Sequence, residues 1–228
     1  MSDITTTQPV TPLDRARPAL VIHTALRREV RLAGPLVRDV AEGDVDRAAV
    51  VAGHLGTVLR LLHHHHENED ELVFPLLEAR TVGAERATVE LMQDQHVMLE
   101  RHLAQIEGVL PEWATAAGSA ERELLADAFD GLEGTLTEHL DEEERVALPI
   151  AERVLTDADW DAVARHGEKG AEGREKLLVF GILAYEGDPA VLASMLAGAP
   201  RPVRALLPRL ALRRYRRHAT VIHGTPTP

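Results

Sequence analysis

Residues 63–75, HHHHENEDELVFP, place four consecutive histidines directly before a run of acidic residues. Imidazole and carboxylate groups at this spacing can bind a cation together, and they suit iron, manganese or zinc. The run lies well inside the chain, which argues against an affinity tag at a terminus. The question is therefore which of the four histidines belongs to a site, and which residues elsewhere join it.

A second stretch, 139–149, answers this question by repetition, because it reads HLDEEERVALP. Three residue pairs share an offset of 74: His65 and His139, Glu69 and Glu143, Pro75 and Pro149. Two further pairs share an offset of 73: His23 and His96, Leu26 and Leu99. The pattern predicts a duplicated helical hairpin, with one histidine on its first helix and His-x-x-x-Glu on its second. The repeat selects His65 from the run of four.

Helix geometry predicts that these histidines share one level of the fold. In an antiparallel pair of helices, residues equally far from the turn lie side by side. The midpoint of His23 and His65 is 44, that of His65 and His96 is 80.5, and that of His96 and His139 is 117.5. Each midpoint falls on or beside a stretch that breaks helices. An error of two residues would move a level by only about 3 Å.

The i,i+4 spacing of each His-x-x-x-Glu motif puts both side chains on one helix face, so Glu69 and Glu143 would face inward with the four histidines. A buried carboxylate without a partner is costly, and a divalent or trivalent metal ion removes that cost. Two six-coordinate ions offer about twelve positions. Four histidines, two bridging glutamates and one bridging oxygen would leave two positions open for a small ligand.

Four long segments have helical periodicity and are rich in helix formers: 18–42, 45–80, 84–112 and 119–155. Helix breakers at 41–44, 81–83 and 116–119 separate them, and Ser119 is the expected N-cap of the last. Gly34-Pro35 is expected to interrupt and kink the first segment, and Pro75 and Pro149 to end or kink theirs. Short connections imply antiparallel neighbours, so we predict an all-α, up-down-up-down four-helix bundle over residues 15–155.

The remaining chain has a different character. Residues 1–14 are expected to be a flexible arm, 156–222 a helical C-terminal extension in which Thr156 caps a short helix, and 223–228 a disordered tail. The stretch Arg201–Arg217 carries seven arginines and no acid. We expect Pro208 to break it, and its apolar residues to pack on the bundle: Val203, Leu206, Leu207 and Leu210. The alternative is binding to an anionic membrane surface or an acidic partner.

Composition excludes several classes of function. The net charge of −12 argues against nucleic acid as a partner, because phosphate binding needs a basic surface. The chain has no cysteine, which removes disulfides, thiolate nucleophiles and cysteine-bound metal clusters. No stretch of about 18 apolar residues could span a membrane, and the first residues do not resemble a signal peptide. We therefore expect a cytoplasmic protein.

The two motifs, each ending in an apolar-Pro pair, and the two lone histidines resemble the hemerythrin-like family, also called the His-His-Glu cation-binding domain. The resemblance covers roughly residues 18–155. It implies a non-haem di-iron centre with an oxo or hydroxo bridge. In that centre, Glu69 and Glu143 would bridge the ions. The terminal ligands would be the four histidines: His23, His65, His96 and His139.

The sequence also departs from the oxygen-carrying members of that family. They have His-x-x-x-His on the third helix, whereas this chain has His96-x-x-x-Glu100, so Glu100 is a candidate for an extra ligand, an outer acid or a solvated residue. They have an acid five residues after the last histidine, which here would be Glu144 rather than Glu143. The chain is more similar to relatives with four histidines and two glutamates, which are linked to iron repair, nitric oxide or peroxide.

The other histidines are expected to lie outside the centre. His63, His64 and His66 would point elsewhere, at about 100° per residue. His66 and Asp70 form a rival i,i+4 pair, but this pair breaks the spacing to Pro75. His54 lies about 16 Å along the helix from His65, so it should pack in the core or line an access path, and His102 should lie on the surface.

The expected function is a di-iron protein that binds or turns over dioxygen, hydrogen peroxide or nitric oxide, in the catalytic case as an oxidoreductase. Zinc or manganese in place of iron fits the same ligands. The alternative is an oxygen- or iron-responsive sensor, or an iron-handling binding module, that signals through the C-terminal extension without turnover. A third reading is a structural bundle that binds no metal.

Overall fold

The structure, a computed structural model, describes residues 13–167 and 173–228. Every regular element in these two ranges is a helix, which confirms the predicted all-α class for the described part of the chain. The predicted N-terminal arm, residues 1–14, lies outside the described residues except for its last two. No helix in the described ranges is long and apolar enough to cross a membrane.

The first two helices, α1 (Arg17–Arg38) and α2 (Val45–Asn68), are joined by a short turn. Asp44 caps α2, because its side chain accepts a hydrogen bond from the backbone N–H of Arg47 at 3.0 Å. The expected interruption at Gly34-Pro35 is wrong, since α1 continues through both residues to Arg38. Pro35 lies in the last turn of α1, where its missing N–H removes one hydrogen bond without ending the helix.

Each of the two repeated motifs contains a π-helical turn. After α2 come η1 (Glu69–Val73) and α3 (Phe74–Arg80). After α4 (Ala84–Ala116) and α5 (Ser119–Glu142) come η2 (Glu143–Ala147) and α6 (Leu148–Val154). The backbone N–H of Phe74 donates to the carbonyl of Glu69, and that of Leu148 to the carbonyl of Glu143. Pro75 and Pro149 then stand in the first turn of a new α-helix, a position that tolerates a missing donor.

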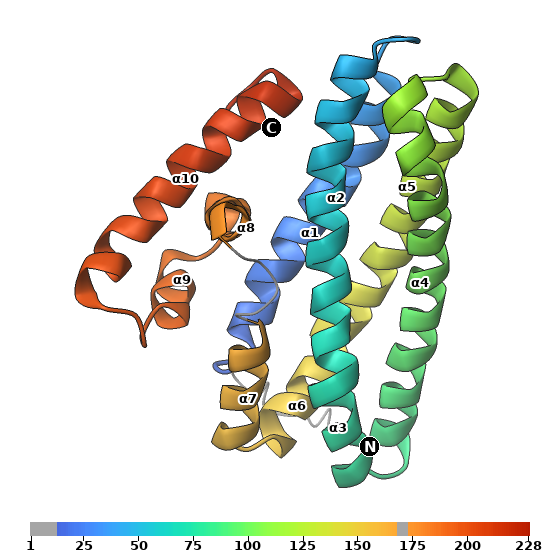
Figure 1. Cartoon of the computed structure of the whole chain (residues 1–228). Helices are drawn as coiled ribbons and strands as arrows, with labels where there is room; N and C mark the ends of the chain where they lie inside the picture. The colour runs from blue at the N-terminus through green and yellow to red at the C-terminus, as the bar shows by residue number, and fades with distance from the viewer. Residues whose placement is uncertain (1–12, 168–172) are drawn as a thin grey trace, which may run out of the picture.

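The four long helices pack side by side around a common core (Figure 1): α1 contacts α2 and α5, and α4 contacts the same two helices. Fully buried leucines from all four fill this core, among them Leu26, Leu55, Leu99 and Leu132. Gly34 of α1 leaves room for the Asp130 side chain of α5, because a Cβ there would lie 2.2 Å from an Asp130 carboxylate oxygen. A second apolar cluster, around Phe74, Leu77 and Met92, closes the end formed by α3 and α6.

The rest of the chain forms α7 (Asp157–Gly167), α8 (Gly173–Glu186), α9 (Pro189–Met195) and α10 (Arg201–His223). As predicted, Thr156 caps α7, since its hydroxyl oxygen accepts from the N–H of Asp159 at 3.3 Å. Helix α8 lies between α1 and α10 (Figure 1). Gly181 allows α8 and α10 to approach, because a Cβ there would lie 2.4 Å from the carbonyl oxygen of Ala211.

Three predictions for the helix ends and the last helix are wrong. Gly118, not Ser119, is the N-cap of α5, and the Ser119 hydroxyl donates to Glu42 instead. Pro208 does not break α10, which is continuous and ends at His223, one residue beyond the predicted extension. The residues expected to pack do not, since Val203, Leu206 and Leu210 are exposed and Leu207 is half-buried.

Helix α10 instead packs through the apolar stripe of its second half: Ala211, Tyr215, Ala219 and Ile222. Spacings of four and three residues put these side chains on one face. The anionic surface or acidic partner suggested for Arg201–Arg217 stays a prediction.

Candidate metal centre

The four histidines chosen by the repeat meet in the buried interior, one from each long helix. Their exposed fractions are 7% or less, and they are His23 on α1, His65 on α2, His96 on α4 and His139 on α5. The Nε2 atoms of His23 and His65 lie 3.0 Å apart, and those of His96 and His139 lie 3.2 Å apart. The predicted common level therefore brings the four rings together.

The two glutamates lie between histidines of different helices. Glu69 is 3.4 Å from Nε2 of His65 and 3.6 Å from Nε2 of His96. Glu143 is 3.7 Å from Nε2 of His139 and 3.4 Å from Nε2 of His23. Each carboxylate thus faces one histidine of its own motif and one lone histidine, an arrangement that suits a group shared between two ions.

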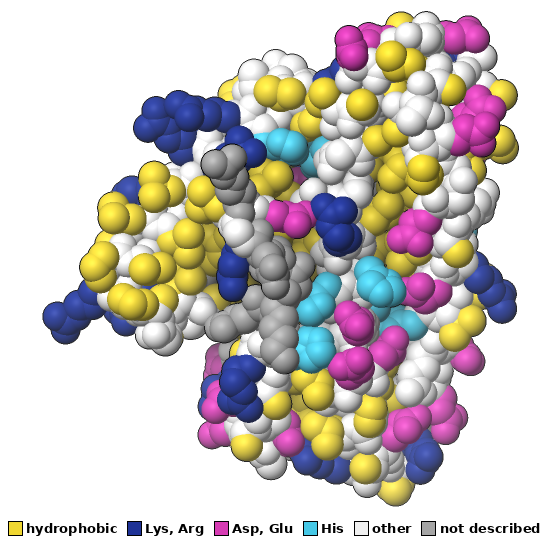
Figure 2. Space-filling view, in the orientation of Figure 1, with side chains coloured by type: hydrophobic (Ala, Val, Ile, Leu, Met, Phe, Trp, Pro, Cys, Tyr) yellow, Lys and Arg dark blue, Asp and Glu magenta, His cyan; other side chains and the backbone are white. Residues whose placement is uncertain are grey.

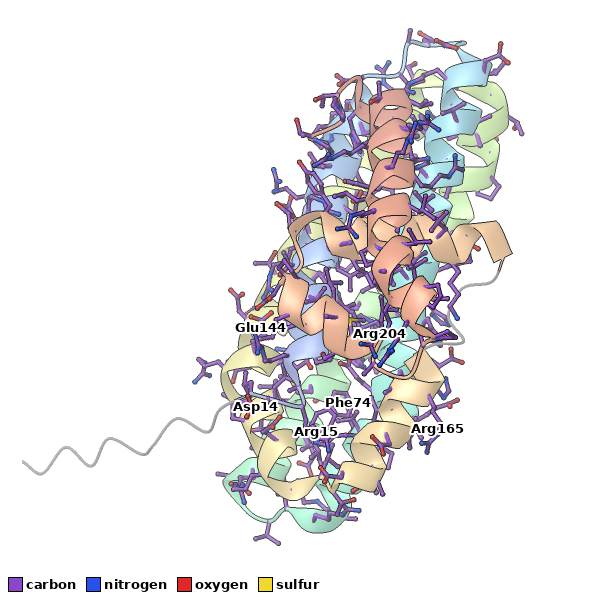
Figure 3. The ribbon with its side chains drawn as sticks, turned by 90° about the vertical axis from the view of Figure 1, so that its left-hand side faces the viewer. Asp14, Arg15, Phe74, Glu144, Arg165 and Arg204 are labelled. Carbon is purple, nitrogen blue, oxygen red and sulfur yellow. The ribbon has the colours of Figure 1, made fainter. Side chains whose placement is uncertain are left out.

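Outer partners hold three of the four rings in a fixed orientation. The Nδ1–H of His23 donates to Glu144 at 2.9 Å, that of His96 to Asp70 at 2.8 Å, and that of His139 to Gln95 Oε1 at 3.0 Å. Figure 3 labels Glu144, which also pairs with Arg27 at 2.5 Å. Asp70 and Glu144 share the offset of 74, so the repeat extends to these partners. Such bonds fix which nitrogen of a metal-binding imidazole remains free.

The resulting orientation fits a cation and is unfavourable without one. With Nδ1–H donating outward, neutral His96 and His139 each direct an Nε2 lone pair at the other across 3.2 Å. Two acceptors at this distance repel unless a positive charge lies near both. In addition, Oε2 of Glu69 and Oε2 of Glu143 are buried and have no hydrogen-bond partner. Buried polar atoms are rarely left in this state unless they bind something.

Sequence reasoning missed His66. Its side chain is 2% exposed, and its ring centroid lies 4.3 Å from that of His96 and 5.4 Å from that of His139. Both of its ring nitrogens are buried without a partner. The expectation that His66 points away from the centre is therefore wrong. His65 and His66 are neighbours on α2, and both side chains are buried.

The donors fall into two groups within the described residues. One contains His23, His65, Glu69 and Glu143, and the other contains His66, His96 and His139. In each group, one ligand atom per residue lies within 4.8 Å of the others. Because His65 and His66 are adjacent, α2 supplies both groups. The site has the composition of two adjacent cation positions.

The remaining candidates lie elsewhere. Glu100 is half exposed and 3.4 Å from His63 Nδ1, so it does not reach the centre. His63 is 60% exposed, and His64 stacks on His166 of α7. Figure 2 shows histidine and acidic side chains gathered on this face of the molecule. His102, expected on the surface, is half-buried and 3.1 Å from the hydroxyl of Thr135.

The surroundings favour neutral imidazoles. Burial, followed by the neighbouring histidines, lowers the pKa of His65 and His66 well below the usual value of 6.5, and lowers the pKa of His139 to about 2. Burial and the charge of Glu143 raise the pKa of Glu69. These imidazoles are thus neutral at neutral pH, and each has one unprotonated nitrogen that can act as a ligand. Bringing two carboxylates together here is unfavourable unless a positive charge joins them.

The π-helical turns and an aromatic ring set the position of the carboxylates. Glu69 and Glu143 are the first residues of η1 and η2, and π-helical turns occur frequently at functional sites. Phe74, labelled in Figure 3, lies directly after η1, with its ring centroid 5.1 Å from that of His96. This buried ring places apolar surface beside His96. The carboxylates therefore face the histidines in an environment with little water.

Comparison with known families agrees with this geometry. The family model for the hemerythrin HHE cation binding domain matches residues 21–151, which include every residue of the centre. The match covers more than half of the chain, so the chain belongs to this family, and the resemblance seen in the motifs is confirmed. Comparisons with curated proteins and with solved structures gave no match.

Proposed function

We propose that this member of the hemerythrin family is a non-haem di-iron protein that binds or turns over a small oxygen or nitrogen species. The observation that carries the proposal is the pair of adjacent donor groups. A positive charge between them would stabilise both their inward lone pairs and the unpartnered carboxylate oxygens. The family's cation-binding character supports it. Zinc and manganese suit the same donors, so metal analysis is needed to identify the bound metal as iron.

In this proposal the two ions have different histidine ligands. His23 and His65 would bind one ion, and His66, His96 and His139 would bind the other. Glu69 and Glu143 would each reach both, because each faces one histidine of either group. His66 is the fifth histidine, and it would fill one coordination position that a set of four histidines leaves open. On the same count one open position remains, and it lies on the ion beside His23 and His65.

An iron pair would supply electron transfer to or from dioxygen, hydrogen peroxide or nitric oxide. The chain's own residues prepare the site for this chemistry. Asp70, Gln95 and Glu144 hold protons on Nδ1 of their histidines, which keeps each Nε2 free and raises its basicity. The buried ring of Phe74 beside His96 limits access by water. In the catalytic form of the proposal the protein is an oxidoreductase that consumes peroxide or nitric oxide.

A sensor is the second candidate, and one contact favours it. Helix α7 packs against η1, the turn that begins with the proposed ligand Glu69. His166 of α7 lies 3.7 Å from Glu71 of the same turn. A ligand that moves the Glu69 carboxylate would thus act on a segment in direct contact with the extension. In this form the protein signals through residues 156–222 and does not turn over its ligand.

We also propose how the helices of the core are arranged. Residues 15–155 would form one up-down-up-down four-helix bundle derived from a duplicated hairpin. The paired π-helical turns support a duplication, because η1 and η2 begin at residues that share the offset of 74. The outer acids Asp70 and Glu144 support it in the same way.

The test is anaerobic loading with iron(II), followed by metal analysis and Mössbauer spectroscopy. We expect two irons per chain that become magnetically coupled on oxidation. The double variant His65→Ala, His139→Ala should lose the coupled pair, whereas His63→Ala, at an exposed position of the same run, should keep it. A folded wild-type protein that takes up no iron would refute the proposal. Assays with peroxide and nitric oxide then separate turnover from sensing.

A further inference from the structure

A second buried group of imidazole and carboxylate side chains lies where α10 packs against α1 and α2. It consists of Glu29 on α1, His54 on α2, and His218 and His223 on α10. One ligand atom each from Glu29, His54 and His223 lies within 4.8 Å of the other two. His54 is eleven residues before His65, which places the group about 16 Å along the helix from the di-iron site. It is a separate site.

The two oxygens of Glu29 have different surroundings. Oε1 accepts from the Arg28 guanidinium at 2.6 and 3.1 Å and from the hydroxyl of Tyr215 at 3.1 Å. Arg28 is itself held by Glu186 at 2.7 Å and by the carbonyl of Ile182 at 2.9 Å. Oε2, in contrast, is buried and has no hydrogen-bond partner, and the side chain of Glu29 is fully buried. One oxygen is therefore anchored and the other is free.

The free oxygen faces two histidines. Nε2 of His54 lies 3.3 Å from Oε2 of Glu29 without forming a hydrogen bond to it. The other nitrogen of His54, Nδ1, lies 3.2 Å from Nε2 of His218. The ring of His223 is nearly perpendicular to that of His54, at a centroid distance of 5.6 Å. This is the pattern seen at the di-iron site: an outer partner on one ring nitrogen, and the other nitrogen directed at an unpartnered carboxylate oxygen.

We propose that Glu29, His54 and His223 bind one divalent transition-metal ion, with Zn²⁺ as the best match. Two imidazoles and one carboxylate are a recurring set of three zinc ligands, which leaves a fourth position for water. His218 is a positioning residue, because its contact with Nδ1 of His54 keeps Nε2 directed at the ion.

Charge and burial agree with this assignment. Two hydrogen bonds from the Arg28 guanidinium to Oε1 favour the charged form of Glu29, so the group is a carboxylate. Burial, followed by the proximity of His54, lowers the pKa of His218 and His223 to about 4. Both imidazoles are neutral at neutral pH and have a lone pair to donate. Arg28 balances the anchored half of the carboxylate without reaching Oε2.

The simplest alternative is a metal-free pair of Glu29 and protonated His54. That pair would direct a ring N–H at Oε2 in hydrogen-bond geometry, and Oε2 instead has no partner. The alternative also gives His223 no role.

An ion at this position would join α10 to α1 and α2. Arg47 of α2 donates to the carbonyls of Val221 and Ile222, directly before His223, and so fixes the end of α10 against α2. The ion would add a second attachment, through the side chain of His223. The C-terminal helix would then be fastened to the core by a metal, and its release would depend on metal supply.

The experiment uses full-length protein titrated with Co²⁺, whose visible absorption reports imidazole and carboxylate ligands, together with Zn²⁺ counted by mass spectrometry of the metal. We expect three Zn²⁺ per chain in the wild type. His223→Ala and Glu29→Gln should each bind two, and His218→Gln should bind the third ion 10- to 100-fold more weakly, about the loss typical of an outer partner. His102→Ala, at a half-buried histidine outside both sites, is the matched control and should bind three.

A His66→Ala, His96→Ala double variant separates this inference from the proposed function. It should weaken binding at the di-iron site and keep the Co²⁺ spectrum of the third ion. Amide hydrogen exchange of residues 201–223 should slow on adding Zn²⁺ to the wild type and stay unchanged in His223→Ala. If wild type, His223→Ala and Glu29→Gln bind equal numbers of ions while circular dichroism shows all three folded, the second site does not exist.

Discussion

At the scale of single residues, the centre depends on pairs of nitrogens with different partners. His23, His96 and His139 each have one nitrogen bonded to an outer acceptor and the other directed inward. The outer acceptor determines which nitrogen is free to bind an ion. Mutating an outer acceptor should therefore weaken metal binding without removing any ligand.

Gln95→Leu tests this point. The substitution removes the acceptor of the His139 Nδ1–H and keeps a side chain of similar length, so the imidazole loses its fixed orientation. We expect iron or Co²⁺ binding to weaken by about 10- to 100-fold. Competition with a chelator of known affinity measures the change. Gln105→Leu, at an exposed position of the same helix, is the control. Equal affinities in the two variants would show that Gln95 does not orient His139.

The metal-free protein should lose stability as pH falls below about 6.5. His65, His66 and His139 have lowered pKa values in the folded state, so the unfolded chain takes up protons there that the folded chain does not. Glu69 has a raised pKa and acts in the opposite direction, but one glutamate offsets only one of three histidines. Their stabilising contribution is complete above the unfolded pKa and decreases with acidification.

Urea unfolding of chelator-treated protein measures this effect between about pH 7.5 and pH 5.5. The free energy of unfolding should fall with pH in the wild type. The slope should be smaller in a His65→Gln, His66→Gln double variant, because two of the titrating groups are gone. Parallel slopes would mean that these histidines are not the source of the pH dependence.

The sequence located part of the centre because that part is repeated. The offsets of 73 and 74 identify His23, His65, His96, His139 and both glutamates. The residue that corresponds to His66 in the second half is Leu140, so a donor present in only one half has no repeat to reveal it. The one available signal was the i,i+4 pair of His66 and Asp70. Its acid bonds to His96, not to His66.

At the scale of helices, sequence reasoning placed the long segments well and their irregularities poorly. Periodicity did not reveal the two π-helical turns, because each spans only five residues, too few to show a change of period. In α10, Pro208 removes the hydrogen bond to the carbonyl of Arg204, and because Arg204 is exposed, water can bond to that carbonyl and the helix continues. None of the four residues of the packed stripe is a leucine and two are alanines, so a search for leucines overlooks it.

The packing of α8 on α10 gives a prediction at this scale. In Gly181→Ala the new methyl group would lie 2.4 Å from the carbonyl oxygen of Ala211 and 2.9 Å from Cβ of Tyr215, so the helices must separate. We expect a loss of about 1–3 kcal/mol in the free energy of unfolding. Gly53→Ala on α2 has nothing within 4 Å and should be neutral or stabilising by up to about 1 kcal/mol. Chemical denaturation measures the free energy of unfolding of both variants. Similar losses of stability in the two would contradict close packing at Gly181.

At the scale of the whole molecule, two donor sites at different heights connect five helices. The proposed di-iron site joins α1, α2, α4 and α5, and the proposed second site joins α1 and α2 to α10. Binding to the folded state alone stabilises a protein by mass action. A chelator should therefore lower the melting temperature in two steps as metal is removed, and His223→Ala should lack the step that belongs to α10. A single step in both proteins would argue against two independent sites.

The most direct test of the central claim is anomalous X-ray scattering at the iron absorption edge from crystals of the iron-loaded protein. We predict two adjacent iron peaks among the buried donors. One should lie next to His23 and His65, and the other next to His66, His96 and His139, with Glu69 and Glu143 between them. A single peak, or a second peak without His66 beside it, would contradict the division of ligands proposed here. The absence of any iron peak among these residues would contradict the di-iron assignment itself.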